Sequence, residues 1–147
     1  MWSQLLAGGA VSFINFGIHA VMTTLIVVAT GRTAKRTGHL HVFGRLTALL
    51  AITMLALMIA HVVEIAVWAA FYENVGLTTV NANAFEFAFE NYTALGYGDA
   101  VPNPALRLIG PVTALNGLLL IGWSVAIIFE VMRMAEVQFE KPRKRTR

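Results

Sequence analysis

The sequence predicts an all-α membrane protein with three membrane-spanning helices and one short helix that enters the membrane and returns on the same side. The 147 residues are 57% hydrophobic and only 13% charged, whereas soluble domains carry roughly 25% charged residues. Three apolar stretches, at about 6–30, 46–72 and 105–132, each exceed the roughly 20 residues that a spanning helix needs. A soluble three-helix protein is disfavoured because it would expose large apolar faces.

The 6–30 stretch is predicted to be a retained spanning helix and not a signal peptide. Residues 1–4 carry no basic side chain, and basic residues follow the apolar run instead of preceding it. Asn15 and His19 are polar residues within this stretch, and polar groups inside a membrane need protein partners. We expect them to make helix–helix contacts, with the helix itself at the periphery of the protein, in the lipid.

Basic residues predict the orientation of the chain. Every Lys and Arg except Arg107 lies either between the first two apolar stretches or after the third. Since basic residues are enriched on the cytoplasmic side, the 31–45 loop and the C-terminus are expected in the cytoplasm. The N-terminus and residues 73–104 then face outward from the cell (inner) membrane. Three aromatic residues are expected at the outer headgroups: Trp68, Phe71 and Tyr72.

The basic tail is expected to attract anionic lipid, at about 1 kcal/mol per Lys or Arg near the surface. Its terminal basic run has no interleaved aromatic side chains, so nucleic-acid binding is not predicted. No helix carries arginines at every third position, which a voltage sensor would need. The sequence has no cysteine, no His-Glu-x-x-His spacing and no set of nucleophile, base and orienting residue, so an enzyme is not predicted.

Residues 84–93 predict a short helix of roughly three turns, which is too short to span a membrane. Asn83 followed by Glu86 resembles a capping box at its start. A short helix can dip into the membrane and return through an extended loop only where protein or a water-filled cavity covers its backbone. The helix is therefore expected to be covered in one of these two ways.

The ends of the long helices also have sequence signals. Gly76 is expected to end the second spanning helix. Asn103 and Pro104 are expected to start the third, with Asn as the N-cap residue and Pro at the first helical position. Within the third helix, Gly117 and Gly122 allow either close packing against a neighbouring helix or bending at a gate. Both interpretations are open.

The run at residues 93–99 (Thr-Ala-Leu-Gly-Tyr-Gly-Asp) is the most informative stretch of the chain. Gly96 and Gly98 tolerate positive φ at little steric cost, so they allow successive carbonyl groups to point the same way along an extended segment. A stack of such carbonyls can replace the water around a dehydrated cation. The run lies between a short amphipathic segment and a long apolar one, and this context predicts an ion pathway.

In this context the sequence resembles the potassium-channel pore family, and more closely the small bacterial ion-channel proteins described as two-pore-domain-like. The resemblance covers about residues 46–134 and rests on these segments: 61–64 (His-Val-Val-Glu), 68–72 (Trp-Ala-Ala-Phe-Tyr), 93–99, 107–108 (Arg-Leu) and 115–119 (Leu-Asn-Gly-Leu-Leu). It implies a homotetramer with one pore loop per chain, a selectivity filter on the four-fold axis, and K⁺ ions without an organic cofactor. The chain then divides into an additional helix with a basic loop (1–45), a pore domain (46–134) and a basic cytoplasmic tail (135–147).

The resemblance assigns roles within the filter. Four residues are expected to bind K⁺ through backbone carbonyls, and a fifth completes the outer end: Ala94, Leu95, Gly96 and Tyr97, with Gly98. The Tyr97 ring is expected to point away from the pore and brace the filter. The family usually has Thr where this chain has Ala94, so the innermost ion site is expected to be weakened. The hydroxyl of Thr93 lies one residue out of phase and is not expected to substitute.

Two carboxyl groups have alternative interpretations. Glu90 falls where some bacterial potassium channels have a carboxyl that pairs with the aspartate after the filter, here Asp99, and such a pair would share a proton or a water. The alternative places Glu90 in the outer vestibule. Glu130 either forms a ring of four carboxylates at the cytoplasmic mouth of the pore or pairs with Arg133 on its own helix.

His61 and Glu64 lie three residues apart on one face of the second spanning helix. Because charge inside the bilayer is costly, they are expected to face protein and to pair with each other or with the short helix at 84–93. They are interpreted either as a structural contact or as a proton-sensitive gate. A metal site is disfavoured, since two ligands are too few without His19 from another helix.

The predicted function is passive conduction of K⁺ through the carbonyl filter. A weakly selective cation channel is an alternative, because of Ala94. Active potassium transporters resemble four pore units fused in one much longer chain, so 147 residues weigh against this class. A non-conducting scaffold or regulatory subunit is the remaining alternative.

Overall fold

The computed structural model describes residues 1–36, 42–77, 83–96 and 102–143, with side chains described as far as Thr33 in the first range and from Phe43 to Ala135 in the others. The elements in these ranges are α1 (Trp2–Arg36), α2 (Val42–Val75), α3 (Ala84–Tyr92), the 3₁₀ turn η1 (Pro104–Leu106) and α4 (Ile109–Arg143). Three stretches are long and apolar enough to cross a membrane: Trp2–Thr33, Phe43–Val75 and Ile109–Ala135. The predicted class, with three spanning helices and one short helix, is confirmed.

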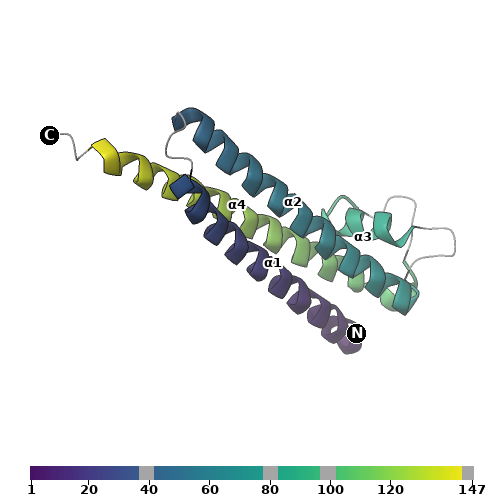
Figure 1. Cartoon of the computed structure of the whole chain (residues 1–147). Helices are drawn as coiled ribbons and strands as arrows, with labels where there is room; N and C mark the ends of the chain where they lie inside the picture. Colours follow the sequence, from purple (N-terminus) through teal and green to yellow (C-terminus); the bar gives the residue numbers. More distant parts are fainter. Residues whose placement is uncertain (37–41, 78–82, 97–101, 144–147) are drawn as a thin grey trace.

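The three long helices lie side by side, and α2 runs antiparallel to α1 and α4 (Figure 1). Helix α3 packs against α2 and α4 at the end of the bundle where α2 ends and α4 begins. The N-terminus lies at this same end, and the C-terminus lies at the opposite end. This relative arrangement is the one that the distribution of basic residues requires, and the side that faces the cytoplasm stays a prediction.

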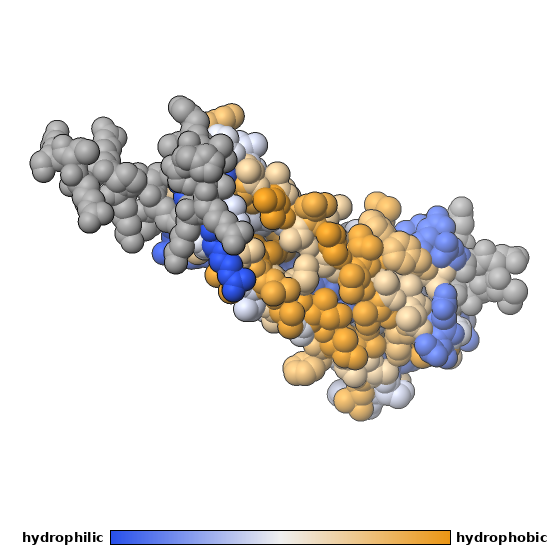
Figure 2. Space-filling view, in the orientation of Figure 1, coloured by the Kyte–Doolittle hydropathy of each residue, from blue (hydrophilic) through white to orange (hydrophobic). Residues whose placement is uncertain are grey.

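Most apolar side chains of the bundle face outward. Only 22% of the most apolar windows of α1 and α2, and 33% of that of α4, are buried. Hydrophobic residues cover the middle of the visible face, and hydrophilic residues gather toward its ends (Figure 2). Such a surface needs lipid or further protein around it, because soluble monomers rarely expose contiguous apolar patches larger than a few hundred Å².

The interior consists of two apolar clusters with polar side chains between them. The larger cluster surrounds α3 and includes Trp68, Tyr72, Phe87, Tyr92, Ile109 and Leu120. The smaller one contains Ile26, Leu57, Ile127 and Val131. On each long helix a buried polar residue falls between the two clusters: His19 on α1, Glu64 on α2 and Ser124 on α4. We call this set, together with His61, the polar layer.

The prediction of headgroup positions was wrong for two of the three aromatic residues of α2, and Phe71 is only partly buried. Trp68 and Tyr72 are fully buried instead of lying at the headgroups. The indole Nε1 of Trp68 donates to Oδ1 of Asn116 at 2.9 Å, and the hydroxyl of Tyr72 donates to Oγ1 of Thr113 at 2.7 Å. Buried Trp and Tyr need a partner for their polar tips, and here α4 supplies it.

One helix end agrees with its sequence signal and one does not. Helix α2 ends at Val75, and Gly76 follows with φ 63°, as its C-cap role requires. Asn103 does accept a hydrogen bond, from the backbone N–H of Ala105 at 3.0 Å, but it caps η1 and not the third spanning helix. Helix α4 begins only at Ile109, so the prediction placed its start too early.

The start of α4 depends on α1. The side chain of Gln4 donates to the carbonyl of Ala105 at 2.5 Å, and its Oε1 accepts from the N–H of Leu108 at 3.1 Å. The middle of η1 and the residue before α4 are therefore held by a side chain about 100 residues away in the sequence. Local spacing carries no signal for such a contact.

Candidate functional site

Helix α3 is positioned by its N-cap and by one buried face. Asn83 is in an extended conformation, and its side chain accepts from the N–H of Phe85 at 2.9 Å. The buried face packs against α2 and α4 and consists of Ala84, Phe87, Ala88, Asn91 and Tyr92. Phe85 and Phe89 stay exposed on the other face. The short re-entrant helix is thus covered by protein on one side, as a non-spanning helix at membrane depth requires.

Gly117 allows α3 to approach α4 closely. A Cβ atom at this position would lie 1.9 Å from the backbone oxygen of Tyr92, which no side chain can tolerate. At Gly122, by contrast, a Cβ atom would meet nothing within 4 Å. The close-packing interpretation therefore describes Gly117, whereas Gly122 has no such contact within one chain.

The chain leaves α3 through two residues with positive φ. Ala94 has φ 56° and donates its N–H to Asn91 O at 3.0 Å, and Gly96 has φ 119°. Between them Leu95 is 81% exposed and donates its N–H to Glu90 O at 2.9 Å. The positive φ expected for Gly96 is confirmed, whereas the positive φ of Ala94 has no sequence signal.

Several predicted filter contacts involve residues that the structure does not describe. Tyr97, Gly98 and Asp99 lie outside the described residues, so the bracing ring and the pair between Glu90 and Asp99 stay predictions. Thr93 is described, and its hydroxyl donates to the carbonyl of Phe89 at 2.9 Å, within its own helix.

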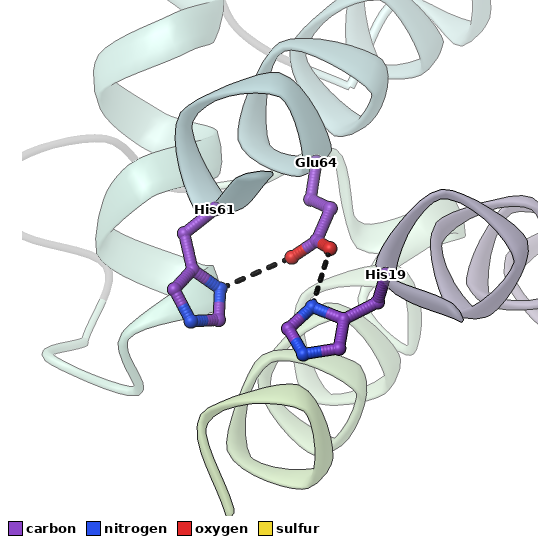
Figure 3. A group of neighbouring side chains, drawn as sticks. All are labelled: His19, His61 and Glu64. Carbon is purple, nitrogen blue, oxygen red and sulfur yellow. Dashed lines mark hydrogen bonds and ion pairs between the residues drawn. The ribbon is translucent and has the colours of Figure 1, made fainter. Parts of the chain in front are cut away.

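A carboxylate with two imidazoles forms the centre of the polar layer (Figure 3). Nδ1 of His19 lies 2.8 Å from Oε1 of Glu64, and Nδ1 of His61 lies 3.1 Å from Oε2 of the same carboxylate. His19 and Glu64 are fully buried, and the side chain of His61 is 18% exposed. The predicted pairing of His61 with Glu64 is present, and the structure adds His19 from α1.

Helices α3 and α4 complete this cluster. The hydroxyl of Tyr92, at the end of α3, donates to Oε2 of Glu64 at 2.5 Å. Burial and the neighbouring Glu64 carboxylate raise the pKa of the Tyr92 hydroxyl above its usual range, so it stays a donor. Ser124 Oγ lies 2.9 Å from Nε2 of His61 and 3.4 Å from Nε2 of His19. Sequence reasoning missed Tyr92 and Ser124, because neither residue type is unusual in an apolar helix.

Helix α1 packs onto the other helices through buried polar side chains, while most of its apolar surface faces outward. Asn15 is fully buried, and its Nδ2 donates to the backbone carbonyl of Glu64 at 3.2 Å and to Oδ1 of Asn116 at 3.1 Å. Gly8 lies so close to α4 that a Cβ atom there would meet Val112 at 2.9 Å. The predicted helix–helix contacts of Asn15 and His19 are present, but they join the interior of the bundle, because a polar group at mid-membrane needs a protein partner.

Glu130 forms the ion pair that its spacing allows. Its carboxylate accepts two hydrogen bonds from the guanidinium of Arg133, at 2.7 and 2.9 Å. Both side chains are exposed. Within one chain Glu130 is therefore an ordinary i,i+3 partner of Arg133.

These features define a class of protein: a membrane protein in which a short helix covered by spanning helices leads into a glycine-containing segment with positive φ. A family model described as ion channel matches residues 56–134, which is more than half of the chain. The chain therefore belongs to this ion-channel family, and the resemblance noted from its motifs is confirmed at that level. Ion transport, and not catalysis, is the activity that this membership indicates. The match spans most of α2, all of α3 and most of α4, and it leaves α1 outside.

Comparison with curated proteins and with solved structures gave no match.

Proposed function

We propose that four copies of this chain surround an axial pore and conduct K⁺ passively through backbone carbonyls. The proposed ligands are the carbonyl oxygens of Ala94, Leu95, Gly96 and Tyr97, and Gly98 completes the outer end. The observation that carries the proposal is the Leu-Gly-Tyr-Gly-Asp run directly after the short covered helix α3, with Gly96 already at φ 119°. Membership of the ion-channel family supports it.

The assembly as a tetramer is part of the proposal. Each chain carries one such run, and a ring of carbonyls around a cation needs several chains. Exposed apolar residues on α3 and α4 offer surfaces for neighbouring chains: Phe85, Phe89, Leu115, Leu118 and Leu119. The C-terminal ends of four α3 helices would direct partial negative charge toward a central cavity and favour a cation there.

Orientation and lipid contacts follow from the charges. We propose that the end of the bundle that carries α3 and the N-terminus faces outward, and that the basic loop and tail face the cytoplasm. The tail, beyond residue 134, would then lie close to anionic lipid of the inner leaflet of the cell membrane.

Reconstitution into liposomes tests the proposal. Purified full-length protein is expected to carry a K⁺ flux, and reversal potentials under opposed K⁺ and Na⁺ gradients are expected to follow the K⁺ gradient. Gly98→Ala is expected to abolish the current, because an L side chain resists the positive φ that we expect for this glycine. Gly9→Ala is the matched control, since a Cβ atom at Gly9 on α1 meets nothing within 4 Å. Selective K⁺ current in Gly98→Ala would contradict the filter assignment.

A weakly selective cation channel is the second candidate, and one observation favours it. Ala94 places a methyl group where the family usually has a hydroxyl that lines the innermost ion site. Reversal potentials that shift with both cations would support this alternative. A folded tetramer without flux would instead indicate a non-conducting subunit.

The backbone at Ala94 makes a separate stability prediction. A left-handed conformation costs an L residue roughly 1–2 kcal/mol, and Ala94 has φ 56°. Ala94→Gly is therefore expected to raise the thermal unfolding temperature of the purified protein, with a gain of up to about 1 kcal/mol after the chain-entropy cost of glycine. Ala94→Thr is expected to lower it, since β-branched residues resist this region.

The same strain opposes any benefit of a threonine hydroxyl at the innermost ion site. Ala88→Gly, within α3, is the control and is expected to destabilise by about 1 kcal/mol or more. An unfolding temperature that falls equally in Ala94→Gly and Ala88→Gly would contradict the strained conformation of Ala94.

A further inference from the structure

The polar layer contains three potential metal ligands from two helices. His19, His61 and Glu64 each offer one ligand atom, and these atoms all lie within 4.8 Å of one another. Figure 3 shows both imidazoles directed at the same carboxylate, His19 from α1 and His61 from the turn of α2 that carries Glu64. From the sequence, only His61 and Glu64 could be placed together, and two ligands are too few for a zinc site.

The spacing fits a transition metal of the zinc class. Metal–ligand bonds of about 2.0–2.1 Å at tetrahedral angles place neighbouring ligand atoms about 3.3 Å apart. The closest separations are 2.8 Å from Nδ1 of His19 to Oε1 of Glu64 and 3.1 Å from Nδ1 of His61 to Oε2, so each imidazole lies slightly closer than this to its own carboxylate oxygen. Since one ligand atom from each residue lies within 4.8 Å of the other two, a shift of the two rings toward each other would place both imidazoles and the carboxylate around one ion.

Ser124 is placed to orient the ligands. Metal-binding histidines usually donate their second ring N–H to a polar neighbour, which fixes the ring. Both imidazoles turn Nδ1 toward the carboxylate, and Ser124 Oγ lies 2.9 Å from Nε2 of His61 and 3.4 Å from Nε2 of His19. The serine on α4 thus occupies the position that an orienting residue needs.

The charge of the cluster also favours a cation. The partners found for the Glu64 carboxylate are two imidazoles and one phenol, none of which carries a fixed positive charge. The carboxylate is fully buried near the middle of a spanning helix, where an uncompensated charge is costly. A bound divalent ion would compensate it, and the partly exposed side chain of His61 provides access.

We propose that His19, His61 and Glu64 form a binding site for a divalent transition metal of the zinc class, with a fourth position left for water or for a neighbouring hydroxyl. The site links α1, which lies outside the matched family region, to the pore domain. It also competes for the carboxylate oxygen that accepts from Tyr92, two residues before Ala94. Metal binding therefore acts on the contact that holds the end of α3.

Metal analysis of the purified full-length protein tests the site. After incubation with Zn²⁺ and dialysis, we expect about one zinc ion per chain, and Co²⁺ in its place is expected to give the visible absorption bands of a four-coordinate ion. His19→Gln removes one ligand but keeps a hydrogen-bonding amide, and it is expected to weaken binding at least about 100-fold, since even second-shell changes cost 10–100-fold. Ser124→Ala is expected to weaken it about 10-fold.

The two remaining histidines provide the control. A double variant, His39→Asn with His41→Asn, is expected to bind zinc as the unmodified protein does. Loss of zinc in that double variant would overturn the proposal, as would undiminished zinc and cobalt binding in a folded His19→Gln variant or no stoichiometric binding by the unmodified protein. If His19→Gln does not fold, the Ser124→Ala result decides, and unchanged affinity there is the contradicting outcome.

A flux measurement adds an independent arm. Zn²⁺ is expected to change the K⁺ flux of the unmodified protein and to leave that of His19→Gln unchanged. This arm alone rests on the proposed channel function. Stoichiometric zinc binding without any K⁺ flux would overturn the channel and leave the metal site standing.

Discussion

Gly117→Ala is expected to abolish K⁺ flux and to lower the yield of folded protein sharply. The new methyl group would lie 1.9 Å from the backbone oxygen of Tyr92, and the atom it meets belongs to the main chain and cannot rotate away. Overpacking against side chains already costs about 1–3 kcal/mol, and a collision with backbone leaves fewer ways to relax. Helix α3 must then move away from α4 and take the start of the proposed filter with it.

Gly122→Ala is a close control for this variant. It makes the same change on the same helix, at a position where a Cβ atom meets nothing within 4 Å. Alanine favours helix over glycine by about 1 kcal/mol, so the control is expected to be neutral or slightly stabilising. The thermal unfolding temperature and the yield of folded protein, measured for both variants, test this difference. Equal behaviour of the two variants would show that α3 does not rest on Gly117.

Glu64→Ala is expected to have the second-largest effect, on stability. The substitution removes the acceptor shared by His19, His61 and Tyr92. Each buried donor left without a partner costs about 1–3 kcal/mol, with coupling among the three. Since these donors belong to α1, α2 and α3, the loss is expected to loosen all three helices, with a total of about 3 kcal/mol or more.

Two controls isolate the cause in this case. Glu64→Gln keeps an acceptor oxygen and nearly the same volume, so it is expected to retain part of the lost stability. Glu130→Ala removes a carboxylate whose ion pair with Arg133 is exposed, and it is expected to leave the unfolding temperature nearly unchanged. If Glu64→Ala unfolds at the same temperature as Glu130→Ala, the polar layer does not hold the bundle together.

Local signals predicted the elements well. The spanning helices follow from the length and hydropathy of three stretches, and the membrane-spanning segments in the structure extend each of them by a few residues at one end or both. Asn83 and Gly76 act as the caps that their residue types favour, because capping involves only neighbouring backbone groups. The short helix at α3 follows from the same kind of local evidence.

Contacts between distant residues were predicted poorly. Trp68 lies near the end of an apolar stretch, where aromatic residues usually contact lipid headgroups. Only the packing of α4 against α2 shows that its indole donates to Asn116 instead. The start of α4 was placed too early, because Gln4 of α1 holds the segment before it. Ala94 takes a positive φ that its residue type disfavours.

The amino-acid sequence by itself determined that this chain is a membrane protein, where its helices lie, and where a Gly-Tyr-Gly run follows a short helix. These properties depend on hydropathy, length and near neighbours along the chain. Only the tertiary structure decided that Asn15 and His19 of α1 are buried in the bundle and that His19 joins His61 and Glu64. That grouping depends on which faces of the three long helices meet. Because these helices are apolar all round, their hydrophobic pattern does not identify the faces that contact one another.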